Sequence, residues 1–219
     1  MRNPGKRSIF LFMISIFILA GFVRPAYAAI TLVGSAIGTG DVSASAPAIS
    51  VSAGDTVVAI AGAQTGSVVF SDSETDTPTL VTTQADSGTT VFEQMSYFTV
   101  ATTSTTYTVT ATFTCGSCSA ANRNALVVLV YRGVTSVGSN VATTGSSTNP
   151  SVVLTTAASG DYAVAGFSWR GNTADCTTGL VGNDRNIQPS AGSASRVTAS
   201  GFDNTGSTSV TNAECLSTS

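Results

Sequence analysis

The strongest constraint on this chain is a strict two-residue alternation that runs through Thr105–Thr114. Threonine occupies every second position from Thr106 to Thr114. The positions between them hold Tyr107, Val109, Ala111 and Phe113. Because successive side chains of a strand point to opposite faces, this pattern predicts a strand with one packed face and one solvated face. After residue 28 no stretch of ten or more residues shows helical periodicity, so we predict an all-β chain.

Three almost continuously apolar segments predict central strands that are covered on both faces. They are Thr56–Ala63, Ala125–Tyr131 and Tyr162–Trp169. Further strands are predicted at Ile30–Ile37, Ala48–Val51, Ser67–Phe70, Thr79–Thr83, Thr90–Val100, Ser151–Thr155, Ser193–Ser200 and Ser207–Thr211. Short strands at intervals of about ten residues, separated by Gly, Ser, Asp and Pro, are typical of a β-sandwich or barrel.

A weak internal similarity bears on the topology. Pro47 and Pro150 each precede a short strand, and each is followed by a Gly-Asp turn and an apolar strand. Two similar halves favour a jelly roll, while chance similarity in a β sequence of low complexity is the alternative. We predict a two-sheet antiparallel sandwich of jelly-roll-like form, in one domain that covers residues 29–219.

The N-terminus has the pattern of a secretory signal peptide. Basic residues occur in residues 1–8, an apolar run follows over residues 9–23, and Ala26-Tyr27-Ala28 is a cleavage pattern. We predict a signal peptide over residues 1–28 and a secreted protein, extracellular or at the cell surface. A retained membrane anchor is the alternative, but Arg24-Pro25 interrupts the apolar run.

Composition excludes several functions. The chain contains no histidine, and Lys6 is its one lysine, so histidine triads, histidine metal sites and lysine nucleophiles in the body of the chain are excluded. Residues 1–28 hold four of the nine basic residues and none of the twelve acids, which leaves five arginines and a net charge of −7 after cleavage. A chain without a basic patch is not expected to bind nucleic acid. No membrane insertion is expected after removal of the signal.

Several segments together resemble a known group of proteins. They are Ile30–Ser35, Gly54–Ala59, the turn Ser71–Thr77, and Leu126–Tyr131 running into Arg132-Gly133-Val134. The set is similar to secreted bacterial and phage-associated β-sandwich modules of unassigned function, over most of residues 30–170. The resemblance implies a secreted sandwich and supplies no catalytic residue. The C-terminal segment departs from the group, because it is polar where those modules end in an apolar strand.

The four cysteines are predicted to form two disulfides, because the count is even and the chain is predicted to be exported. They are Cys115, Cys118, Cys176 and Cys215. We favour Cys115–Cys118 with Cys176–Cys215, although two other connectivities are open. Cys115 and Cys118 have C-x-x-C spacing, but they lie between two predicted strands rather than at a helix N-terminus, so a structural bridge is favoured over redox catalysis. A zinc site is a further alternative.

Two segments are weak candidates for binding sites. Asp72, Glu74 and Asp76 place three acids at alternate positions, and their oxygens could bind calcium. A solvated hairpin turn is the favoured interpretation, and no cofactor is expected from the sequence apart from this calcium alternative. Trp169, the only tryptophan, could stack on a sugar ring at a strand end. Its alternation with the apolar residues of the same strand favours a position in the core.

The sequence predicts a protein that is not an enzyme. Without histidine, hydrolysis would need a carboxylate pair, and most acids occur in turn-like contexts. Glu93 lies within a predicted strand, where a surface position explains it. The leading hypothesis is a non-catalytic extracellular structural or adhesive module, with self-association in a surface assembly as one form of it. The alternative is a carbohydrate-binding, lectin-like domain whose partner is a surface glycan.

Overall fold

The computed structural model describes residues 29–63, 66–85, 91–114, 124–138, 140–142, 151–154, 161–170, 183–188, 197–205 and 210–213. Within these ranges the regular secondary structure is β-strand, and every strand pairing is antiparallel. The predicted all-β antiparallel class is therefore confirmed. No helix long and apolar enough to cross a bilayer occurs in the described ranges. The predicted signal peptide, residues 1–28, lies outside them.

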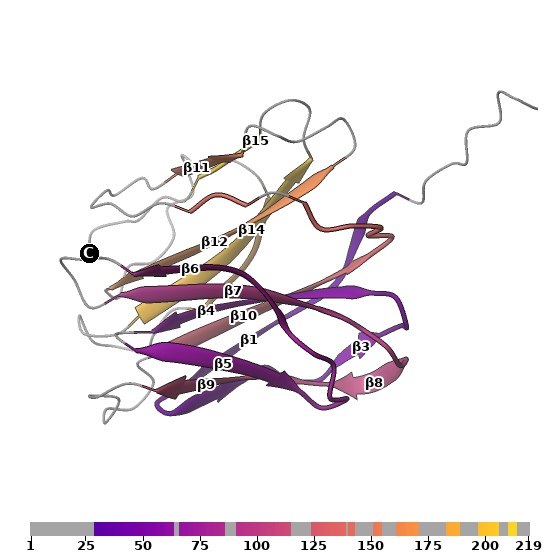
Figure 1. Cartoon of the computed structure of the whole chain (residues 1–219), viewed down its shortest axis with the longest axis horizontal. Helices are drawn as coiled ribbons and strands as arrows, with labels where there is room; N and C mark the ends of the chain where they lie inside the picture. The colour runs from indigo at the N-terminus through magenta and orange to yellow at the C-terminus, as the bar shows by residue number, and fades with distance from the viewer. Residues whose placement is uncertain are drawn as a thin grey trace, which may run out of the picture.

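A five-stranded sheet forms the centre of the fold (Figure 1). Its order is β1 (Thr31–Gly40), β10 (Asn124–Arg132), β4 (Thr56–Ala63), β7 (Phe92–Thr99) and β6 (Thr79–Ala85). Every residue of β4 is buried, and so is every residue of β10 except Arg132. The interiors of the two strands are apolar because other strands cover both of their faces. The central positions predicted for two of the three apolar segments are confirmed.

A second layer covers one face of the central sheet. It contains the sheet β2 (Ser43–Ser45), β9 (Val109–Thr114) and β5 (Ser67–Asp72), and the pair β3 (Ile49–Val51) and β8 (Ser104–Tyr107). The predicted alternation of Thr105–Thr114 is confirmed, since its four apolar side chains are buried between the layers. The predicted single strand is divided at Thr108, because the backbone N–H and C=O of Thr108 bind Ser73 of a neighbouring turn.

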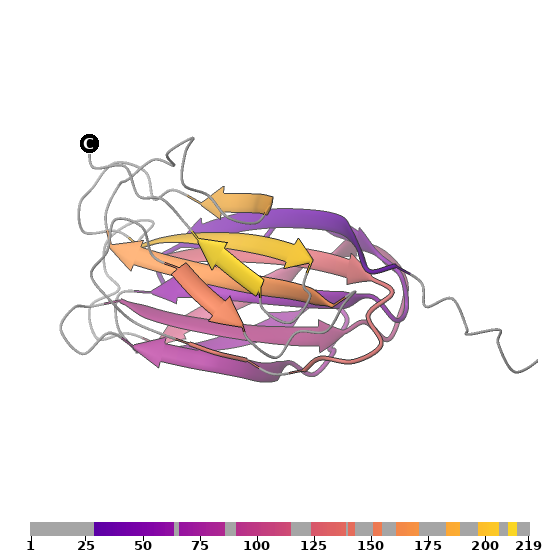
Figure 2. The same ribbon diagram turned by 90° about the horizontal axis from the view of Figure 1, so that it is seen from above.

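A third layer covers the opposite face (Figures 1 and 2). Its sheet has the order β12 (Tyr162–Arg170), β14 (Val197–Thr205) and β13 (Asn183–Gln188). The pair β11 (Ser151–Leu154) and β15 (Val210–Ala213) packs on the outside of β12, where Val152 and Leu154 contact buried residues of that strand. β12 is apolar because both of its faces are covered, but it is an edge strand and not a central one as predicted.

Two strands, β2 and β13, were not predicted from the sequence. β2 has only three residues, and β13 has the polar sequence Asn-Asp-Arg-Asn-Ile-Gln, so neither carries the apolar pattern on which the predictions rest. The two C-terminal strands occur a few residues after their predicted positions, because polar sequence there gives weak boundary signals.

Candidate functional site

The predicted disulfides cannot be placed, because Cys115, Cys118, Cys176 and Cys215 all lie outside the described residues. Trp169 belongs to β12, where its backbone pairs with Thr198. The side chain of Trp169 lies outside the described part of the structure. The choice between a core position and a sugar-stacking role for Trp169 therefore stays a prediction.

The acidic segment Asp72–Asp76 forms a turn, but it is not the predicted hairpin turn. It connects β5 to β6, and these strands belong to different sheets and do not pair with each other. The carboxylate Oδ1 of Asp72 accepts hydrogen bonds from the backbone N–H groups of Glu74, at 2.6 Å, and Asp76, at 3.2 Å. Thr75 has a positive φ of 64°, which allows the chain to reverse within the turn.

The acidic turn is attached to neighbouring strands at two places. The N–H of Ser73 donates to the carbonyl of Thr108, at 3.1 Å, and the N–H of Thr108 donates to Ser73 Oγ, also at 3.1 Å. The N–H of Ala101, in the segment before β8, donates to Asp76 Oδ1 at 3.2 Å. These contacts hold the turn against the end of β8, where Tyr107 is located.

Tyr107 lies against two of the three predicted calcium ligands. Its side chain has no solvent-accessible surface and belongs to the core between the central sheet and the second layer. Burial, together with the negative charges of Asp72 and Asp76, raises the pKa of the Tyr107 hydroxyl well above its usual range. The carboxylates are near enough to act on the phenol, yet neither is aligned to accept a hydrogen bond of standard geometry from it.

Glu74 does not join this cluster. Among the described residues, no group of three or more histidine, cysteine or acidic side chains is arranged to bind a metal. Of the three predicted carboxylates, Asp72 and Asp76 lie beside the phenol of Tyr107. The strand alternation predicts Tyr107 on the packed face but carries no information about the partners of its hydroxyl. A buried tyrosine needs a partner for its hydroxyl, and this was the one sequence signal that pointed to a polar group beside Tyr107.

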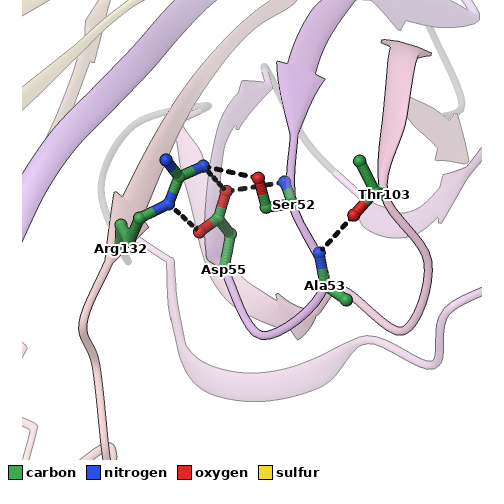
Figure 3. Close-up of polar contacts among 5 residues, drawn as sticks. All are labelled: Ser52, Ala53, Asp55, Thr103 and Arg132. Atoms are coloured by element: carbon green, nitrogen blue, oxygen red, sulfur yellow. Dashed lines mark hydrogen bonds and ion pairs between the residues drawn. The ribbon is translucent and has the colours of Figure 1, made fainter.

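A second polar cluster joins a turn to the central sheet (Figure 3). Asp55, at the start of β4, is almost completely buried, and Arg132, at the end of β10, donates to both of its carboxylate oxygens at 2.8 Å. The backbone N–H of Ser52 also donates to Asp55, at 2.8 Å. Burial acts to raise the pKa of Asp55, but the hydrogen bonds and charge of Arg132 and the Ser52 N–H outweigh it and lower the pKa. This arrangement is a structural link between adjacent strands.

Glu93 is not at the surface, contrary to the expectation from its sequence context. It lies on β7 under the third layer, where a Cβ atom on Gly166 of β12 would be only 3.1 Å from Glu93 Oε1. Burial raises the pKa of Glu93 to about 7, and the nearby Ser168 hydroxyl acts in the opposite direction. The third layer is close enough to exclude most water from the carboxyl group, although part of the residue keeps some exposure.

No known protein family, curated protein or solved structure matches this chain. The resemblance to secreted β-sandwich modules therefore stays a prediction. The functional interpretation depends on the chemistry of the residues described above.

Proposed function

We propose that this chain is an exported, non-catalytic structural or adhesive module that self-associates by pairing β-strands at the β6 edge of its central sheet. Export rests on the signal-peptide pattern of residues 1–28. The proposal includes a jelly-roll-like sandwich core, which the internal similarity of the two halves favours. The observation that carries the proposed association is the composition and exposure of β6.

β6 is an edge strand, and β7 is its hydrogen-bonded neighbour in the central sheet (Figure 1). None of its seven residues is charged, and none is proline. Leu80 keeps 58% of its surface exposed, so a strand that pairs at this edge would bury apolar surface. Natural edge strands commonly carry lysine, other charges or proline, which oppose pairing with a second chain. A register irregularity between Leu80 and Thr82 is present, but Thr82–Ala85 continue in regular pairing.

The occupant that fits this edge best is β6 of a second copy. Two identical strands can pair antiparallel about a two-fold axis, which closes the assembly as a dimer. A strand without charged residues meets its copy without like-charge repulsion between opposed side chains. Exposed Leu80 would then gain a partner side chain, so burial of apolar surface would add to the backbone hydrogen bonds.

The electrostatics of the described residues support a role without catalysis. The Asp55 carboxylate is engaged by Arg132 and by the backbone. Glu93 lies beneath the third layer, where Gly166 and Ser168 are its neighbours among the described side chains. A glycosidase would need two carboxyl groups facing a shared substrate site.

Sedimentation velocity over a range of concentrations tests the proposed association. The wild-type chain without residues 1–28 is expected to form dimers, and Leu80→Lys is expected to shift it to monomers, because each copy would bring a positive charge to the paired edge. Val42→Lys is the matched control, because Val42 is similarly exposed, at 62%, but lies between β1 and β2 rather than on β6.

Three results would overturn the association. One is a wild-type chain that stays monomeric at high concentration. Another is dimerisation that is unaffected by Leu80→Lys, and the third is an equal loss with Val42→Lys, which would indicate a general effect of added charge.

A further inference from the structure

We propose that Asp72, Asp76 and Tyr107 bind a calcium ion where the acidic turn meets the core of the sandwich. This site is distinct from the β6 edge and does not depend on association of the chain.

The strand alternation directs these oxygens toward one another. Val68 and Phe70 of β5 are buried, and Asp72 occupies the next position of the same inward-facing series. On β9, Val109 pairs with Asp72, and Tyr107 at the end of β8 comes two residues before Val109 on the same buried face. Asp76 reaches the same place from the turn, where the N–H of Ala101 holds its carboxylate.

Each of the three side chains has one buried oxygen that lacks a hydrogen bond of standard geometry. Asp72 and Asp76 use Oδ1 to accept backbone hydrogen bonds, but their Oδ2 atoms are buried and accept none. The hydroxyl oxygen of Tyr107 is also buried, and its contacts with Asp72 and Asp76 lack standard hydrogen-bond geometry. Leaving a buried polar atom unpaired is costly, and the cost is larger for a charged group. Three such atoms in one place therefore indicate a missing ligand.

The charge and donor types favour calcium. Two carboxylates match the charge of a divalent cation, and no cationic side chain among the described residues forms an ion pair with Asp72 or Asp76. A bridging water would satisfy hydrogen bonds but would leave this negative charge uncompensated. The hydroxyl oxygen of Tyr107 would be the third protein ligand. Calcium accepts carboxylate, carbonyl and water oxygens in irregular arrangements, whereas magnesium demands a near-ideal octahedron.

Terbium, a luminescent substitute for calcium, provides the first measurement because a nearby tyrosine sensitises its emission. Terbium added to the wild-type protein should emit on excitation of tyrosine, and calcium should displace it. Thermal unfolding with calcium chloride, compared with sodium chloride at equal ionic strength, provides the second. Asp76→Asn removes a ligand charge, and Tyr107→Phe removes only the phenol oxygen. Glu74→Gln is the matched control, because it removes one acid from the same turn but not from the cluster.

Calcium should raise the melting temperature of the wild type, and Asp76→Asn should lower calcium affinity by at least about tenfold. Tyr107→Phe should reduce both the affinity and the sensitised emission, while Glu74→Gln should retain them. The site is disproved if calcium up to about 10 mM, above the affinity range of extracellular modules, gives no response. An equal loss with Glu74→Gln would also overturn it. The site is also disproved if Asp76→Asn is more stable than the wild type and responds to calcium as the wild type does.

Discussion

Arg132 donates from Nε to one carboxylate oxygen of Asp55 and from Nη2 to the other, with both distances at 2.8 Å (Figure 3). The pair spans neighbouring strands, since Asp55 immediately precedes β4 and Arg132 ends β10. Its two members differ in environment. Asp55 is 1% exposed, whereas the side chain of Arg132 is 52% exposed. Loss of Arg132 therefore leaves the Asp55 carboxylate buried without a counter-ion, while loss of Asp55 leaves a guanidinium that water can solvate.

Arg132→Met should destabilise the protein at neutral pH. The lowered pKa of Asp55 means that its charged form is favoured in the folded state, so its stabilisation is present at neutral pH. That stabilisation is lost as the pH falls below 3.8, the ordinary value for Asp55, and through its lower folded-state value. The stability difference between wild type and Arg132→Met should therefore shrink in acid. Urea unfolding at a series of pH values measures it.

The double variant Arg132→Met with Asp55→Asn distinguishes an unpaired buried carboxylate from lost packing of the Arg132 side chain. If the unpaired carboxylate of Asp55 causes the loss of stability, removing its charge should restore part of the stability at neutral pH. Additive losses in the double variant would contradict this explanation.

Local pattern predicted individual strands well, but it could not determine their partners. The alternation around Val109 identified a buried face, because that signal depends only on neighbouring residues. The division of β5 and β6 between two sheets depends on contacts with distant strands, so the acidic turn was misinterpreted as a hairpin. For the same reason Tyr107 was predicted to be buried, but its approach to Asp72 and Asp76 was not foreseen. Glu93 was assigned to the surface because no local signal indicated a third layer above β7.

Gly166→Ala should destabilise the contact between the third layer and the central sheet. A Cβ atom at this position would lie 2.5 Å from Cγ2 of Ile60, which is completely buried. Because Ile60 has little room to move in a packed core, the cost should be about 1–3 kcal/mol. Chemical denaturation measures it, and Gly138→Ala is the control, since a Cβ atom there would meet nothing within 4 Å. Equal stability of the two variants would show that the layers do not approach this closely.

Glu93→Gln should stabilise the protein above pH 7 and have a smaller effect near pH 4. Burial raises the pKa of Glu93 from 4.5 to about 7, so the folded state favours its neutral form. Wild-type stability should therefore fall as the pH rises from 4.5 to 7, by at most about 3 kcal/mol, and glutamine removes this loss. Ser168→Ala should steepen the loss, because the hydroxyl favours the charged form. Urea unfolding from pH 4 to 8 compares the free energies of unfolding of the three proteins. If the difference between wild type and Glu93→Gln stays constant across this range, Glu93 is not a buried titrating carboxyl group.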